Sequence, residues 1–446
     1  MSETTLGGAA DVIARLGEVA RDLARRYPGG AGRQAVHTVY GGAHLFTADA
    51  AAKLGAVALR ALEAHAPHPA AFAAALAVDL ALMERVYPRV VAKLRREPVE
   101  DFRIDFEDGY GVRPDAEEDG HAAAAAGEVA RGLEAGSLPP AVGIRVKPFS
   151  AELAARSLRT LDLFVTTLCR ATGGRLPEGF VVTLPKVMAP EQPAALAEVL
   201  GRLERGLGLA GGALRLELMI ETPQSILDPS GRAGVRRLVE AAEGRCAAAH
   251  FGTYDYTALC EITAHYQEMT HPACDFAKQV MQVALAGSGV QLSDGSTNIL
   301  PVAPHRPRDG GALTAEQSEE NLRAVHAAWR LHYGHVRRSL VQGYYQGWDL
   351  HPAQLPTRYA AVYAFFLEGL DAASERLRNF LAKAAQATLV GDVFDDAATG
   401  QGLLNYFLRA LGCGALDEEE VLARTGLPRE ALATRSFVAI LERTQR

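Results

Sequence analysis

The chain has 446 residues, of which 48% are hydrophobic and 22% charged, with a net charge of -7 and a pI near 6.0. This composition is typical of a folded globular protein with a large core and excludes a long disordered chain. The acidic balance argues against a nucleic-acid partner, which normally requires a basic face.

Few features of the sequence indicate the cellular compartment of the protein. Five cysteines show no C-x-x-C spacing, so we expect free thiols in a reducing compartment. The N-terminal residues lack the charged region and apolar run of a secretory signal. The longest apolar stretches fall short of the roughly 18 to 20 residues that span a bilayer. We therefore expect a cytoplasmic protein with no membrane partner.

Short apolar runs alternate with amphipathic helical segments along most of the chain. Each apolar run predicts a strand that ends on a polar or charged residue. The predicted strands are residues 35–40, 102–108, 142–149, 180–187, 214–222, 247–255, 290–294 and 343–351. The predicted helical segments are 8–27, 48–65, 69–97, 121–133, 150–171, 190–207, 231–243, 256–286 and 356–386, with two or three shorter helices in 402–446.

Strands that alternate with helices form right-handed parallel βαβ units. Eight such strands with polar ends favour a closed (β/α)8 TIM barrel of the α/β class over an open sheet. No G-x-G-x-x-G follows the first strand, which argues against a dinucleotide-binding sheet. We predict a barrel catalytic domain with N-terminal helical additions over residues 1–352. A C-terminal helical extension over 353–446 is expected to pack on the barrel or on a neighbouring subunit.

Two consecutive strands end on acids. The runs LELMIET and AAAHFGTYDYTA carry Glu221 and Asp255. Because the carboxyl ends of barrel strands form the active-site mouth, both acids are expected to face one cavity. Two hard oxygen ligands suit Mg²⁺, with Mn²⁺ as an alternative, and the substrate would complete the shell. The competing interpretation is a capping or salt-bridged acid at each strand end.

Charged residues also end the second, third and fourth strands. Strand alternation would point Asp105 and Glu107 to one face and Asp108 to the other. Arg145 is suited to bidentate recognition of a carboxylate or phosphate, and equally to pairing with that acidic cluster. Lys186 could form a Schiff base with an oxo acid. An electrostatic or structural role for this lysine agrees better with a metal site.

Two further strand ends carry candidates for proton transfer. Asp294 ends the seventh strand and His351 the eighth, and each could instead be an ordinary hydrogen-bonded residue. No serine lies in a G-x-S-x-G motif, so serine hydrolase chemistry has no support.

The motifs DFEDG, RVKP, LPKV, IET and FGTYDYTA, in this order, resemble the HpcH/HpaI aldolase and citrate lyase beta-subunit group of phosphoenolpyruvate/pyruvate-type barrels. The segment GYYQGWDLHPAQ resembles the closing motif of that group, with Trp348 where lysine is usual. The resemblance implies that Glu221 and Asp255 are magnesium ligands and that Arg145 holds the carboxylate or enolate oxygen of the substrate.

By the same resemblance, Asp105, Glu107 and Asp108 match the acidic cluster that follows the second strand in that group. We expect Glu107, Asp108 and Thr222 to contact the substrate. The resemblance implies an Mg²⁺-dependent carbon–carbon lyase or aldolase that acts on a small 2-oxo acid or 3-hydroxyacyl carboxylate through a stabilised enolate. A water on the metal or Asp294 would move the proton, with Lys186 as a further catalytic candidate. The substrate is expected to be a small carboxylate or an acyl-CoA.

Other functions share the predicted fold. A malate-synthase-like condensation, hydrolysis of an acyl-CoA thioester and phosphoryl transfer involving phosphoenolpyruvate would use the same metal geometry. A barrel that serves as a non-catalytic binding or assembly subunit is the remaining alternative. Related barrels commonly assemble, so a homo-oligomer is expected by analogy.

Overall fold

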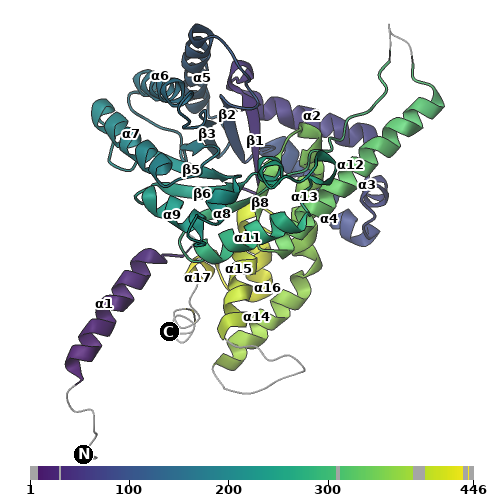
Figure 1. Ribbon diagram of the computed structural model, residues 1–446. Coiled ribbons are helices and arrows are strands. Elements are labelled where there is room, and N and C mark those ends of the chain that lie inside the picture. The colour runs from purple at the N-terminus through teal and green to yellow at the C-terminus, as the bar shows by residue number, and fades with distance from the viewer. Residues whose placement is uncertain (1–8, 30–31, 308–311, 385–396, 435–439, 441–446) are drawn as a thin grey trace, which may run out of the picture.

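The computed structural model describes residues 9–29, 32–307, 312–384, 397–434 and 440. Within them, eight parallel strands close into a barrel in sequence order, with β1 bonded to both β2 and β8 (Figure 1). The predicted (β/α)8 TIM barrel is confirmed. The strands are β1 His37–Gly42, β2 Asp101–Asp105, β3 Ala141–Arg145, β4 Val181–Leu184, β5 Arg215–Ile220, β6 Cys246–Phe251, β7 Gln291–Ser296 and β8 Gln346–Asp349.

Helices surround the barrel and extend the chain at both ends (Figure 1). Among the described residues, none of these helices is long and apolar enough to cross a membrane. The helices that precede β5 are α1 Ala10–Arg26, η1 Ala43–Leu45, α2 Ala50–His65, α3 Pro69–Leu76, α4 Leu80–Arg96, α5 Asp115–Ala135, α6 Ala154–Thr172 and α7 Glu191–Leu207. Those that follow β5 are α8 Pro223–Ile226, α9 Gly234–Ala241, α10 Thr253–Leu259, η2 Ala264–Tyr266, α11 Pro272–Leu285, α12 Ala315–Val341, η3 Pro352–Gln354, α13 Leu355–Glu368, α14 Leu370–Ala384, α15 Ala397–Cys413, α16 Glu418–Thr425 and α17 Arg429–Ala433.

Several strands end earlier than predicted. β2 stops at Asp105 because the Asp105 carboxylate accepts the backbone N–H groups of Glu107 and Gly109, at 2.9 and 2.7 Å, and turns the chain. β6 stops at Phe251, and α10 begins two residues later. Asp255 is therefore not a strand-end residue but lies in the first turn of α10.

Predicted helices also divide. The segment 69–97 is two helices because Ala77 adopts a left-handed conformation, with φ of 55°, and Asp79 then caps α4 through the Leu82 N–H. Segment 256–286 separates into α10, η2 and α11, and segment 356–386 contains α13 and α14. The long helix α12, which the strand and helix pattern did not predict, begins at a capping box formed by Thr314 and Gln317.

The C-terminal helices lie on the helical layer of the same chain. α13 packs against α4 and α12, and its side chains Tyr359, Tyr363 and Phe366 are buried. α14 and α15 pack against each other, and α15 also contacts α13. The helical segment after β8 therefore extends the core that surrounds the barrel rather than standing apart from it.

The barrel interior holds a buried ionic network instead of a purely aliphatic filling. Arg103 donates to both carboxylate oxygens of Glu217, at 2.6 and 2.7 Å, and also bonds to Asp101. His250 lies 3.0 Å from the same glutamate. Burial by itself would raise the pKa of Glu217, but the charge of Arg103 holds it well below its ordinary value. Both partners are thus charged in the barrel centre.

We expect Arg103→Met to lower the free energy of unfolding by roughly 3–5 kcal/mol, because it leaves buried carboxylates without their counter-charge. The matched control is Arg202→Met, which removes a solvent-exposed pair with Glu198 and should cause no measurable change. Chemical denaturation of both variants measures the difference. Equal stability of the two variants would contradict a structural role for the interior network.

Candidate active site

Glu221 directly follows β5 at the mouth of the barrel, and its side chain is 1% exposed. Its Oε1 accepts a hydrogen bond of 2.7 Å from the backbone N–H of Lys186. Its Oε2 accepts no hydrogen bond from any described residue. This oxygen is therefore available to an external ligand.

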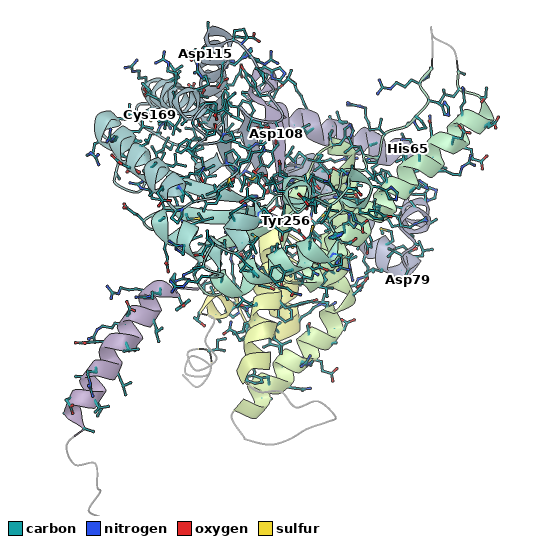
Figure 2. The ribbon with its side chains drawn as sticks, in the orientation of Figure 1. His65, Asp79, Asp108, Asp115, Cys169 and Tyr256 are labelled. Carbon is teal, nitrogen blue, oxygen red and sulfur yellow. The ribbon has the colours of Figure 1, made fainter. Side chains whose placement is uncertain are left out.

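Asp255 supplies a second carboxylate at the same place. It lies on α10, the helix on which Figure 2 labels Tyr256, and its side chain is 40% exposed. Burial and, next in size, the negative charge of Asp255 raise the pKa of Glu221 to about 8. Two carboxylates held close enough to repel in this way would be stabilised by a cation that both of them bind.

The donor set fits a hard divalent cation. Among the residues that the structure describes, no group of three or more His, Cys, Asp or Glu side chains could enclose a metal. Mg²⁺ commonly takes only one or two carboxylates and completes its shell with water and substrate oxygens. Glu221 and Asp255 therefore match a metal that is shared with a substrate better than a closed structural site.

Gly252 lets the two segments approach. Its backbone has φ of -97° and ψ of 95°, which any residue can adopt, so conformation does not require glycine here. A Cβ atom at this position would lie 2.5 Å from both Cβ and Oε2 of Glu221. A side chain at position 252 would therefore push the Glu221 carboxylate out of place.

Arg145 ends β3 and is almost fully buried. Its guanidinium binds Asp105 through two hydrogen bonds, from Nε at 2.7 Å and from Nη2 at 2.5 Å. The remaining nitrogen, Nη1, lies 3.0 Å from Glu107 Oε2 and 3.5 Å from Asp108 Oδ2. Two of the nitrogens are thus fixed by Asp105, and the third is directed toward the rim.

The three acids of the DFEDG motif converge, contrary to the alternation predicted for them. Asp108, labelled in Figure 2 on the loop after β2, contacts both Arg145 and Lys186, as Glu107 does. Alternation fails because the strand ends at Asp105 and the following residues form a turn. In the structure Arg145 is paired with the acidic cluster, which is the competing interpretation of this residue.

Lys186 connects the acidic loop to the metal candidates. Its backbone has a left-handed φ of 51°, and its N–H bonds to Glu221. Its Nζ bonds to Glu107 at 2.5 Å and lies 3.9 Å from Asp255 Oδ2. Burial opposes its charge, but the hydrogen bond and charge of Glu107 raise its pKa. A lysine held charged is a poor Schiff-base nucleophile, which favours the electrostatic role.

Aromatic rings close the barrel beneath the mouth. Tyr40 and Trp348 have ring centroids 4.6 Å apart, and the guanidinium of Arg145 lies 4.9 Å from the Tyr40 ring. Trp348 Nε1 donates to His250 Nδ1 at 3.2 Å, and the Tyr40 hydroxyl contacts Met219 Sδ. These side chains form the floor of the site, so a substrate is confined to the rim above them.

Comparisons with known proteins identify the family of the chain and support its fold. The family described as "Domain of unknown function (DUF6986)" matches residues 16–440. The chain belongs to this family. A search of curated proteins found no match to the DUF6986 chain.

The chain is similar to several solved structures. A citrate lyase from Burkholderia xenovorans LB400 superimposes with a TM-score of 0.54 at 21% identity, covering 76% of this chain and 92% of that one. Native Haloferax volcanii malate synthase gives 0.45 at 15% identity, with 92% and 99% covered. An HpcH/Hpal aldolase/citrate lyase family protein from Burkholderia cenocepacia J2315 gives 0.40 at 11% identity, with 81% and 99% covered. The superposition on the citrate lyase supports the barrel fold that the motif resemblance implies.

Asp294 does not lie with the other candidate residues at the barrel mouth. Its Oδ2 accepts hydrogen bonds from Lys278 of α11 at 3.0 Å and from Ser339 of α12 at 2.6 Å. The side chain therefore points from β7 into the helical layer. β7 continues to Ser296, so Asp294 lies within the strand and not at its end as predicted. The proton-transfer role predicted for Asp294 gains no support from this geometry.

Thr222 and His351 serve local structure. Thr222 Oγ1 donates to the Val187 carbonyl at 2.8 Å and accepts the Ser225 N–H at the start of α8. His351 Nδ1 accepts the N–H of Ala353 in η3. The Thr222 hydroxyl is already occupied on both sides, so the substrate contact predicted for it would require these bonds to break.

Gly252 and Tyr40 are the site residues whose role the sequence indicated most weakly. The glycine could have been suspected, because it directly follows a buried strand next to an acid-bearing turn.

A separate cavity of about 720 Å³ lies among helices, lined by residues such as Val78, Tyr333 and Leu367. It contains none of the predicted site residues.

Proposed function

We propose that this chain is a metal-dependent carbon–carbon lyase or condensation enzyme that acts on a small oxo acid at the barrel mouth. The observation that carries the proposal is the buried Glu221 carboxylate, which faces Asp255 and has its pKa raised to about 8. Perturbed carboxylates of this kind concentrate at functional sites. The shared fold of the citrate lyase is compatible with the proposal but does not by itself assign an activity.

Glu221 and Asp255 would hold Mg²⁺ or Mn²⁺. When bound, the cation would supply Lewis acidity to the carbonyl of a chelating 2-oxo acid and stabilise the negative charge that develops as the adjacent carbon–carbon bond breaks or forms. Glu221 Oε2, which accepts no hydrogen bond from a described residue, is the oxygen available for this purpose.

Arg145 would bind the anionic end of the substrate. Asp105 occupies Nε and Nη2 and so fixes the guanidinium plane. Nη1 contacts Glu107 and Asp108, and a substrate carboxylate would displace these acids from it. Such a contact fixes orientation as well as charge, because the guanidinium cannot rotate while Asp105 holds it.

Lys186 would adjust the charge of the rim. It is held charged beside Glu107, Asp108 and Asp255, so it offsets part of the negative charge that an anionic substrate would meet. The floor formed by Tyr40 and Trp348 limits how far a substrate extends into the barrel. Together these residues favour a small carboxylate that binds at the rim.

The test is calorimetric titration of oxalate, a stable mimic of the pyruvate enolate, into the protein with and without Mg²⁺. We expect binding only when the metal is present, because both carboxylates of the inhibitor would otherwise face Glu221 and Asp255 directly. No binding in either condition would overturn the proposed chemistry. Assays for release of pyruvate, acetyl-CoA or phosphate from candidate substrates would then separate lyase, condensation and phosphoryl-transfer reactions.

A further inference from the structure

Helix α1 carries an apolar stripe that nothing in the described chain covers. Val12, Leu16, Val19 and Leu23 are 41%, 62%, 53% and 50% exposed, and no residue of the helix is buried. Figure 1 shows α1 projecting away from the barrel. Large apolar side chains gathered on one exposed face usually mark a contact surface.

The spacing of the stripe is that of a helix pair. Successive members are separated by four, three and four residues, which is the seam spacing of a coiled coil. The stripe is also symmetric about its midpoint, between Gly17 and Glu18. In an antiparallel pair of identical helices, Val12 would therefore face Leu23 of the second copy, and Leu16 would face Val19.

The charges that flank the stripe have the same symmetry. Arg15 and Asp22 lie on one side of it, seven residues apart, and an antiparallel pair would bring each opposite the other in the second copy. In a parallel pair Arg15 would instead face Ala20. Within one chain the partners of these charges are exposed: Arg15 lies 3.9 Å from Asp11, and Asp22 lies 3.3 Å from Arg25 and 2.7 Å from Arg26. Exposed pairs of this kind are weak and readily exchanged.

We propose that α1 is a self-association helix that pairs antiparallel with α1 of a second copy of this chain. The root of the helix is fixed to the barrel, because the Arg236 guanidinium lies over the Tyr27 ring and the Gly29 N–H bonds to the Gly287 carbonyl at 3.0 Å. A helix of 17 residues is about 25 Å long. A pair of this length is marginal alone, so the contact is reversible and depends on concentration.

Sedimentation of the full chain over a range of concentrations tests the contact. Leu16→Glu places a charge in the seam and should weaken the α1-dependent step at least about a hundredfold. The matched control is Ala14→Glu, which adds the same charge on the opposite face of α1 and should leave association unchanged. Identical sedimentation of the wild type and Leu16→Glu would overturn the proposal, provided that both melt as the wild type does.

A charge exchange tests the antiparallel register. Arg15→Glu and Asp22→Arg should each weaken self-association about tenfold, because each turns both cross-helix pairs into repulsive ones. An equimolar mixture of the two variants should associate as the wild type does, since every pair is then of opposite sign. The two positions are too far apart to interact within one helix. Failure of the mixture to associate would overturn the antiparallel pairing.

Discussion

Glu221→Gln should abolish metal-dependent turnover and weaken metal-dependent binding of oxalate by roughly a hundredfold, about 2.7 kcal/mol. The amide oxygen of glutamine can still accept the Lys186 N–H, so the loop after β4 should keep its position. What the variant lacks is the negative charge that, together with Asp255, would bind the cation. Calorimetry with Mg²⁺ and oxalate measures the loss.

Stability measurements show whether that loss reflects chemistry or unfolding. A carboxyl group whose pKa is raised in the folded state stabilises the protein below its ordinary pKa of 4.5, and the contribution is lost as the pH rises through about 8. Without metal at pH 9, the glutamine variant should therefore be at least as stable as the wild type. If Glu221→Gln turned over at the wild-type rate, Glu221 would not belong to the proposed site.

Asp294→Asn tests the difference between Asp294 and Glu221, two acids that the strand pattern predicted at the barrel mouth. Its partners are Lys278 and Ser339 in the helical layer, so the substitution should reduce stability while leaving metal-dependent oxalate binding intact. If oxalate binding were lost as completely as in Glu221→Gln, Asp294 would have to act at the mouth after all.

Gly252→Ala should reduce turnover to a few per cent of the wild-type rate, although no charged group is changed. The added methyl would lie 2.5 Å from Glu221 Cβ and Oε2, so the carboxylate must move away from Asp255. The backbone at position 252 is extended and tolerates alanine, so the cost in stability should be about 1–3 kcal/mol, from overpacking alone.

Gly120→Ala is the matched control. This glycine lies within α5, and a Cβ there would meet nothing within 4 Å. Alanine at that site should raise stability by about 0.4–1 kcal/mol and leave turnover unchanged. Equal turnover of Gly252→Ala and Gly120→Ala would mean that the exact position of the Glu221 carboxylate has no catalytic consequence.

The eight strands could be predicted from the sequence because each is a short apolar run bounded by a polar end and a helical segment. Local periodicity reports local burial, and that suffices for the order βα and hence for a closed parallel barrel. It also suffices to place Glu221 and Arg145 at the mouth, since both occupy strand ends. The division of segment 69–97 at Ala77 was missed, because an alanine in the left-handed conformation has no sequence signature.

The sequence by itself determined the fold and the candidate residues, while the tertiary structure decided which side chains meet. Register aligns Asp105 of β2 with Arg145 of β3, which creates the bidentate pair. Packing turned Asp294 toward Lys278 and away from the mouth. Asp255 lies near enough to raise the pKa of Glu221 because α10 starts directly after β6 and Gly252 leaves room. Such partnerships arise between segments far apart in the chain, so local patterns carry no record of them.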